Sequence, residues 1–511
     1  MQRRSLLRIL TVGGTIGTSI GVGTSTTNLV QSVQAQSESG WQQQQRLVAP
    51  DGEPQNGFGY NVEISDDGTT ALIVPIVTAS QPSPEPVYVY VIEGGQWTFQ
   101  QKITSPEGDS KSGFGSDIAL SGDGSTALVG APDAVTSSFG TTPLRSGKVY
   151  VFTREGGNWL LQDKLKTSVK NGDDELGASV SLSNSGDTAL IGVQQNSVVS
   201  KPPYQCVVFT RNDSSWTQED KLSTNDVVSG DRFGSEVALS GDGSTALISA
   251  KFKDIANSTS IGTAYIFTKD GDTWSQQQKL TGDSKQKWGP FGISVSLSDD
   301  GATALIGSRS TNTETSGIEE SAYVFSRNNG EWSQERILVT DSDAARQNNS
   351  LPVALSDDGT TAVVADIYEA ESTGAAYLFS NVNGTWSQQQ KLTVDINEPG
   401  IFGSSVAVSG DGNTILAGSS FENTEDGNQA GATYVFWADR AGDDDDQSPK
   451  VPSELDDQIT AEQYTAVLDG DDELTAGGIS SAVNQWATTG TVNGVDVGAS
   501  ELSALVNYWA A

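Results

Sequence analysis

The chain has 511 residues, 35% of them hydrophobic, and carries 65 acidic against 29 basic residues, for a formal net charge of -36. Such a charge repels nucleic acid and anionic membranes, which excludes both as partners of the usual basic kind. One cysteine and no histidine exclude disulfides, cysteine-based metal clusters and histidine-dependent catalysis. A carboxylate-rich surface stays hydrated while high salt screens its self-repulsion, so we infer a halophilic source rather than a dedicated acidic binding surface.

The first 35 residues have the features of an export signal. Arg3-Arg4 precede a weakly apolar stretch from Ile9 to Val30, and Val33-Gln34-Ala35 provides a small-residue cleavage site. This order resembles a twin-arginine signal, which implies a secreted or cell-surface protein. No other segment approaches the roughly 18 apolar residues of a transmembrane helix.

Residues 233–280 show the unit that is repeated along most of the chain. Two short apolar runs flank Asp242-Gly243, an alternating aromatic run follows a loop, and a Trp-led polar run closes the unit. Strand-length runs separated by turn residues predict a four-stranded antiparallel sheet with a tight hairpin at Asp-Gly. The opening dipeptide of the unit recurs seven times, at Phe58-Gly59, Phe114-Gly115, Leu176-Gly177, Phe233-Gly234, Phe291-Gly292, Asn349-Ser350 and Phe402-Gly403.

The Trp-led strand also occurs seven times, but its positions are shifted by one unit. It lies at Trp41, Trp97, Trp159, Trp216, Trp274, Trp332 and Trp386, so one copy precedes the first unit and none follows the last. We therefore predict that the N-terminal strand completes the last sheet. The fold class is all-β: a seven-bladed β-propeller of four-stranded antiparallel blades over residues 41–437, with the ring closed by the N-terminal strand.

Loop length distinguishes the two faces of the predicted propeller. The first and third turns of each unit are short, whereas the second turns, such as 132–147 and 251–262, are long and irregular. The links between units lie on the same face as the second turns. Variable loops on a rigid scaffold commonly carry binding residues, so this long-loop face is the candidate binding surface.

The units resemble the FG-GAP repeat of integrin-alpha-type propellers. Phe-Gly opens five of the seven units, and Val129-Gly130-Ala131-Pro132 matches the second half of the name. The resemblance implies extracellular recognition or adhesion. Calcium-binding members carry a loop with several carboxylates between the first two strands, but here that turn is only Ser-Gly-Asp-Gly or Ser-Asp-Asp-Gly. We interpret Asp123, Asp242 and Asp411 as turn residues, because a hairpin with one or two carboxylates lacks the ligands that calcium requires.

The C-terminal part has a different pattern. Residues 438–458 form an acidic linker, and residues 459–511 predict a small helical module, with Ile479, Val483 and Trp486 on one helical face. The module resembles a dockerin or a degraded EF-hand pair. The resemblance places the candidate metal ligands Asp469, Asp471 and Glu501 at loop positions, and it implies docking to a cohesin-like partner. Most other ligand positions lack oxygen donors, so no calcium or other cofactor is required; the alternative is a helical spacer.

No phosphate-binding loop, nucleophile elbow or zinc motif occurs, and no catalytic residue is predicted. Cys206 replaces Val149 or Ala264 of other units, which predicts a buried core thiol. The leading hypothesis is a secreted or cell-surface recognition protein that binds a protein or glycan. A carboxylate-based polysaccharide-active enzyme and a structural envelope component are the alternatives.

Overall fold

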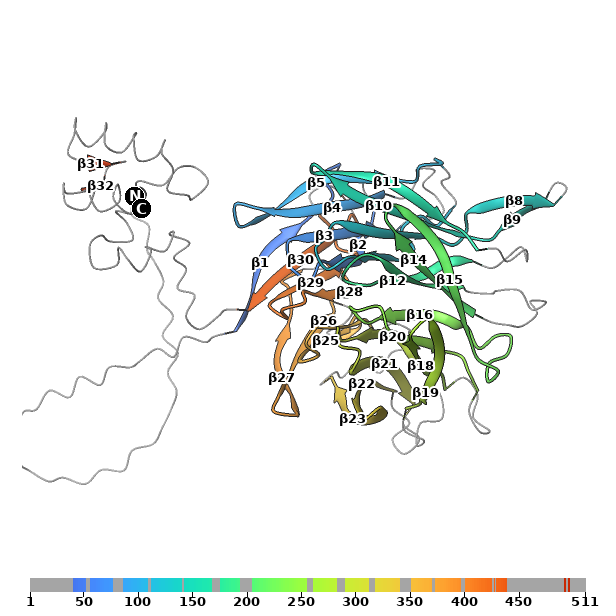
Figure 1. The fold of residues 1–511 in the computed structure, drawn as a ribbon. Helices are drawn as coiled ribbons and strands as arrows, with labels where there is room; N and C mark the ends of the chain where they lie inside the picture. Colours follow the sequence, from blue (N-terminus) through green and yellow to red (C-terminus); the bar gives the residue numbers. More distant parts are fainter. Residues whose placement is uncertain are drawn as a thin grey trace, which may run out of the picture. The chain divides into compact units, whose positions relative to one another are not determined.

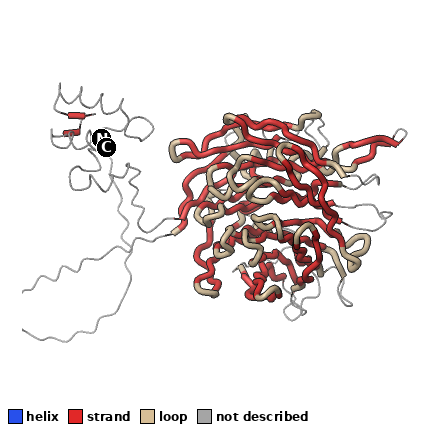
Figure 2. Tube along the Cα trace, viewed as in Figure 1, coloured by secondary structure: helices blue, strands red, loops and turns tan. Residues whose placement is uncertain are grey.

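The computed structural model describes residues 40–51, 56–76, 86–108, 112–139, 142–167, 175–193, 205–254, 261–282, 290–311, 318–340, 351–369, 373–396, 400–424, 427, 429–438, 491–492 and 495–496. All the elements defined in these residues are β-strands. They form seven four-stranded antiparallel sheets and two short hairpins (Figures 1 and 2). The predicted seven-bladed propeller is confirmed in its described part.

The seven blades have the following strands. Blade 1 comprises β2 (Phe58–Ile64), β3 (Thr70–Pro75), β4 (Pro86–Glu93) and β5 (Gln96–Thr104). Blade 2 comprises β6 (Ile118–Leu120), β7 (Thr126–Ala131), β10 (Lys148–Glu155) and β11 (Asn158–Leu165), and blade 3 comprises β12 (Leu176–Leu182), β13 (Thr188–Val193), β14 (Gln205–Asn212) and β15 (Ser215–Ser223). Blade 4 comprises β16 (Phe233–Leu239), β17 (Thr245–Ala250), β18 (Thr263–Asp270) and β19 (Thr273–Leu280), and blade 5 comprises β20 (Phe291–Leu297), β21 (Thr303–Thr311), β22 (Ile318–Asn328) and β23 (Glu331–Val339). Blade 6 comprises β24 (Val353–Leu355), β25 (Thr361–Asp366), β26 (Ala375–Val382) and β27 (Thr385–Leu392), and blade 7 comprises β28 (Phe402–Val408), β29 (Thr414–Ser419), β30 (Ala432–Ala438) and β1 (Trp41–Leu47).

The core lies between neighbouring sheets. In blade 4 the Phe233 ring packs edge-on against Tyr265 and Phe267, with ring centroids 5.7 and 6.3 Å apart. This is the consequence expected of two aromatic residues spaced two apart on one strand. The same cluster contains Cys206 and Val208 from blade 3, and Cys206 is fully buried, as predicted. Contact between apolar faces of adjacent blades thus stabilises the ring.

Closure of the ring follows the predicted strand exchange. β1 pairs antiparallel with β30, and Leu47 lies opposite Thr433. Two glutamines fix this strand to the blades on either side. The Gln390 side chain accepts a hydrogen bond from the Trp41 backbone nitrogen and donates one to its carbonyl, both at 2.8 Å, and Gln45 makes the same pair of bonds to Trp97, at 2.9 and 2.8 Å.

The second turns and the interblade links lie on one face. Gly262, the residue before β18, has a φ of +79° and forms a parallel bridge with Phe291 of the next blade. Gly147 and Gly431 make equivalent bridges to the first strand of the next blade around the ring, at Leu176 and Phe58. The second turn of blade 2 contains an extra hairpin, β8 (Val135–Phe139) and β9 (Thr142–Arg145), which projects beyond the body of the propeller (Figure 1).

Only β31 (Thr491–Val492) and β32 (Val495–Asp496), which form a hairpin, are described in the C-terminal region. The predicted export signal and the predicted helices of residues 459–511 lie outside the described residues. Among the described residues, no helix has the length and apolar character needed to cross a membrane.

Candidate functional site

A channel of about 480 Å³ runs along the propeller axis, lined by the first strands of the blades. It begins near the Phe-Gly dipeptides on the long-loop face, where Tyr60 is 49% exposed, and it ends at the first turns, where Asp66 and Asp357 contribute to the wall. The described lining is dominated by hydroxyl, amide and carboxyl groups and includes no lysine or arginine. The channel therefore offers hydrogen-bonding groups and negative charge to a ligand.

Side chains three residues after the Phe position link one blade to the next. Asp117 accepts a hydrogen bond from the backbone nitrogen of Val180 at 2.7 Å, and the hydroxyl groups of Ser179 and Ser405 accept from Val237 and Val62, both at 3.1 Å. These bonds satisfy backbone donors that face the channel instead of a neighbouring strand. Short polar residues at this position are thus explained by the contacts between blades.

Three carboxyl groups in the channel wall have raised pKa values. Burial, with the nearby charges of Asp117 and Asp66, raises the pKa of Glu63 to about 8. Burial raises the pKa of Glu236 to about 7, although its carboxylate is 3.1 Å from the Lys251 ammonium, and burial raises the pKa of Asp117. At neutral pH this wall therefore contains protonated carboxyl groups that can donate hydrogen bonds as well as accept them.

The first turns of the seven blades meet at the axis in a ring of backbone hydrogen bonds, which we call the axial ring. It comprises Gly122 N to Asn184 O, Asn184 N to Gly241 O, Gly241 N to Asp299 O, Asp299 N to Asp357 O, Asp357 N to Gly410 O, Gly410 N to Asp66 O and Asp67 N to Gly122 O, at 2.9–3.3 Å. Each turn thereby bonds to the turn of the following blade. This ring forms the end of the channel opposite the long-loop face.

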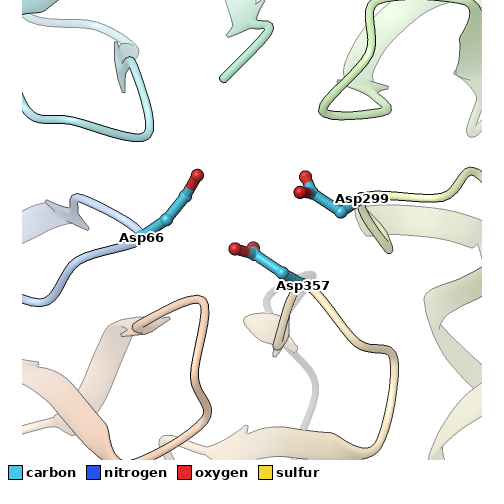
Figure 3. A group of neighbouring side chains, drawn as sticks. All are labelled: Asp66, Asp299 and Asp357. Carbon is cyan, nitrogen blue, oxygen red and sulfur yellow. The ribbon is translucent and has the colours of Figure 1, made fainter. Parts of the chain in front are cut away.

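Three turns place a carboxylate inside the axial ring. Asp66, Asp299 and Asp357 point toward one another from separate hairpins, with one carboxylate oxygen of each within 4.8 Å of the others (Figure 3). We call them the axial cluster. Burial and mutual repulsion raise the pKa of Asp66 to about 6 and that of Asp357 to about 7. Burial also raises the pKa of Asp299, although Asn184 donates a 2.6 Å hydrogen bond to its carboxylate.

Glycine at other ring positions leaves space for these side chains. A Cβ atom on Gly122 would collide with the Asp66 carboxylate, and one on Gly241 or Gly410 would collide with Asp299 or Asp357. Calcium usually takes six or more oxygen ligands, more than three carboxylates supply by single coordination, so we assign no metal to the cluster.

The aspartates that follow the three glycines of the axial ring have a structural role. Asp123 and Asp242 each accept hydrogen bonds from the serine two residues before and from the backbone nitrogen two residues after, and Asp411 makes the same contacts with Ser409 and Asn413. This agrees with their interpretation as turn residues. Asp469, Asp471 and Glu501 lie outside the described residues.

Sequence reasoning missed the carboxyl groups of the axis. It considered each first turn alone, whereas the fold brings three Ser-Asp-Asp-Gly turns to one point. The sequence differs between blades at the second residue of the first turn, which is aspartate in three of the seven blades and glycine or asparagine in the other four. Glu63 gave a similar signal, because alanine or serine occupies the equivalent position in the other six units.

Five blades share a second group of polar residues toward the long-loop face. In each, a carboxylate contacts the tyrosine of the third strand or the lysine or arginine of the fourth strand. In blade 4, Asp226 accepts hydrogen bonds from Tyr265 at 2.9 Å and from Lys279 at 2.6 Å. Equivalent sets are Asp51, Tyr88 and Lys102; Glu369, Tyr377 and Lys391; and Glu422, Tyr434 and Arg46. In blade 2, Glu107 pairs with Lys148 and Lys164, and Lys164 lies over the Tyr150 ring.

The described strands define a seven-bladed β-propeller with a channel along its axis. The FG-GAP repeat family model matches residues 41–81, 97–152, 216–267, 274–325 and 386–436, so the propeller contains FG-GAP repeats. No curated protein sequence matches the chain.

Three solved structures resemble the chain at low sequence identity. Hydrazine synthase of Kuenenia stuttgartiensis is 13% identical with a TM-score of 0.46, covering 71% of this chain and 93% of its own. The Cps50 (Swd1) β-propeller domain of Myceliophteria thermophila is 10% identical with a TM-score of 0.46, covering 77% and 99%. The periplasmic gluconolactonase PpgL of Pseudomonas aeruginosa is 14% identical with a TM-score of 0.35, covering 64% and 97%.

Proposed function

We propose that this is an exported recognition protein that binds a protein or glycan ligand on the long-loop face, over the mouth of the axial channel. The observation that carries the proposal is the difference between the two ends of the channel. One end is bounded by first turns of equal length joined in the axial ring, whereas the other has second turns of unequal length, the β8–β9 hairpin and the half-exposed Tyr60. A rigid scaffold with one variable face is typical of a binding module.

The chemistry of the channel favours a neutral polyhydroxylated or a positively charged ligand group. Its wall offers serine hydroxyls, the Asn61 amide and carboxyl groups, and Tyr60 provides an aromatic ring at the mouth. An anionic polymer would meet the -36 charge of the chain without a compensating cation among the described lining residues. The C-terminal module then serves as an attachment or docking segment for a cohesin-like partner.

The proposal is tested with the full mature chain on a glycan and surface-protein array in molar salt. Tyr60→Ala should weaken retention of the selected ligand at least about tenfold, because it removes an aromatic contact at the mouth. Leu160→Ala is the matched control, because Leu160 is 50% exposed but lies on the outer strand of blade 2. Absence of any retained ligand, or equal loss in both variants, would contradict this function.

A carboxylate-based enzyme acting on polysaccharides is the second candidate. The observation in its favour is the raised pKa of Glu63, about 8, in a channel that contains further carboxyl groups. A protonated carboxyl next to a second carboxylate is the arrangement that glycoside hydrolysis requires. Release of reducing ends from a polysaccharide panel, abolished by Glu63→Gln, would replace the recognition function with this one.

A further inference from the structure

The axial ring combines two features that oppose one another. Its backbone hydrogen bonds link the first turns of all seven blades, and its interior holds the three carboxyl groups of the axial cluster within 4.8 Å. Four of the bonds involve the residues that carry these carboxyl groups: Gly241 N to Asp299 O at 3.1 Å, Asp299 N to Asp357 O at 2.9 Å, Asp357 N to Gly410 O at 3.1 Å and Gly410 N to Asp66 O at 3.0 Å. A change of charge in the cluster therefore acts directly on the ring.

We propose that the axial ring is a proton-operated latch, which is tight when the axial cluster holds protons and loosens when all three of its carboxyl groups are charged. Charged carboxylates this close repel one another and pull on the turns that carry them. A proton held between two carboxyl groups replaces that repulsion with a hydrogen bond. The latch is distinct from ligand binding at the opposite end of the channel.

The groups around the cluster add to this repulsion. Asp66 faces its own neighbour Asp67 and, from the next turn, Asp123; Asp299 is influenced by Asp300 and Asp242; and Asp357 is influenced by Asp358 and Asp411. Glu63, on the strand that leads to Asp66, also interacts with it. Asn184 is a neutral donor to Asp299.

Among the described residues, arginines contact the strands and turns around the cluster: Arg154 donates a hydrogen bond to Thr70, beside the turn of Asp66, at 3.4 Å. Arg211 pairs with Asp187 at 2.8 Å and donates to Thr126 at 3.2 Å, and the charge of Arg327 acts on Asp242. These contacts leave the like charges of the cluster to be balanced by protons. The direction of the pKa shifts agrees, since all three carboxyl groups are displaced upward.

The test is hydrogen exchange of the ring amides, followed by mass spectrometry on the full chain at constant high salt with a chelator. Wild type is compared with Asp66→Asn/Asp299→Asn/Asp357→Asn at each pH, so that the chemical pH dependence of exchange cancels. From pH 5 to pH 8, the protection of the Gly122, Asn184, Gly241 and Gly410 amides against exchange should fall in wild type by at least about tenfold relative to the variant. Tenfold is the change in equilibrium that corresponds to a displacement of one pKa unit.

Asp67→Asn/Asp300→Asn/Asp358→Asn is the charge-matched control, because these residues lie in the same turns and their carboxylates accept hydrogen bonds within the turn. It should still lose protection as pH rises, with the loss displaced toward lower pH, because Asp67, Asp300 and Asp358 no longer raise the pKa values of the cluster. If the triple variant of the cluster does not fold, Asp66→Asn and Asp357→Asn are measured singly and should each reduce the pH dependence. A wild-type-to-variant ratio that is constant from pH 5 to pH 8, or the same loss of pH dependence in the control, would overturn the latch.

Discussion

Gly262 and Gly271 both have positive φ values in blade 4, +79° and +58°, but the space around them differs. A Cβ atom on Gly262 would press on the backbone nitrogen and carbonyl oxygen of Phe291 in the next blade, whereas one on Gly271 would meet no atom within 4 Å. Because these contacts are with backbone atoms, no flexible side chain can move away to make room for the added methyl group. The recurrence of glycine before the third strand, at Gly147, Gly374 and Gly431 as well, therefore reflects the approach of the next blade.

Gly262→Ala should lower the melting temperature much more than Gly271→Ala. Both variants incur the roughly 1–2 kcal/mol cost of a left-handed conformation, but only Gly262→Ala also forces two blades apart, at a cost of about 1–3 kcal/mol more. Differential scanning fluorimetry at constant salt measures the difference. Equal shifts would show that the contact between Gly262 and Phe291 relaxes without cost.

Asp226→Asn tests the carboxylate–tyrosine–lysine group of blade 4. Burial alone would raise the pKa of Asp226, but hydrogen bonds from Lys279 and Tyr265 outweigh it, so the pKa lies below its usual value. A depressed folded-state pKa stabilises the protein above the unfolded-state pKa of about 3.9, and this contribution is lost as pH falls through the folded-state value. The variant should therefore lower the melting temperature at pH 7, and the difference from wild type should shrink below pH 4.

Asp272→Asn is the control for this prediction, because Asp272 is exposed in the third turn of the same blade and the charge change is identical. It should leave the melting temperature nearly unchanged at both pH values. A difference between wild type and Asp226→Asn that stays constant from pH 7 to pH 3 would contradict the linkage.

At the scale of the element, β1 determines whether the ring is closed. It supplies the outer strand of blade 7, and Gln390 and Gln45 attach it to blades 6 and 1. Deletion of residues 41–47 should sharply lower the melting temperature, because it exposes the edge of β30 and removes both glutamine contacts. Addition of a peptide with the sequence of β1 should restore part of the loss by strand addition. An unchanged transition would contradict closure by this strand.

Single substitutions separate the glutamine contacts from strand pairing. Gln45→Ala removes two hydrogen bonds to the Trp97 backbone and should lower the free energy of unfolding by about 1–3 kcal/mol. Gln44→Ala, at the neighbouring exposed position of the same strand, is the matched control. Similar effects of the two substitutions would mean that the contact with Trp97 adds nothing to β1 pairing.

The elements were predictable from sequence because their signals are local. Phe-Gly, the aromatic run and the Trp-led run recur in the same order in successive units, at distances that fit one strand each. The Trp-led run occurs once before the first unit and is missing after the last, which predicts that β1 joins the last blade. The axial cluster was not predictable in this way, because Asp66, Asp299 and Asp357 come from three blades and meet only through the curvature of the ring. The repeated residues predict the fold that all blades share, whereas the carboxyl groups at the axis lie at positions where the blades differ in sequence.

At the scale of the whole molecule, the carboxyl groups fall into two classes. Those at the turns and beside lysines, such as Asp242 and Glu107, have lowered pKa values because hydrogen bonds and cations favour their charged form. Those along the axis, such as Glu63 and Asp357, have raised values, about 8 and 7, because burial and like charges disfavour it. The first class loses its stabilising effect in acid, and the second destabilises the folded state as pH rises, so stability should be greatest at mildly acidic pH.

Salt should stabilise the protein, and more strongly at pH 8 than at pH 5. The chain carries a net charge of -36, and an increase of ionic strength from 0.1 to 1 M shortens the screening length from about 10 to about 3 Å. At pH 8 the axial carboxyl groups with pKa values of about 6 and 7 have lost their protons and add to the repulsion, whereas at pH 5 they hold them. The melting temperature in potassium chloride should therefore rise more steeply at pH 8, and glycine betaine at equal osmolality should not reproduce this difference. The same rise at both pH values would place the effect of salt on the outer surface and not on the axis.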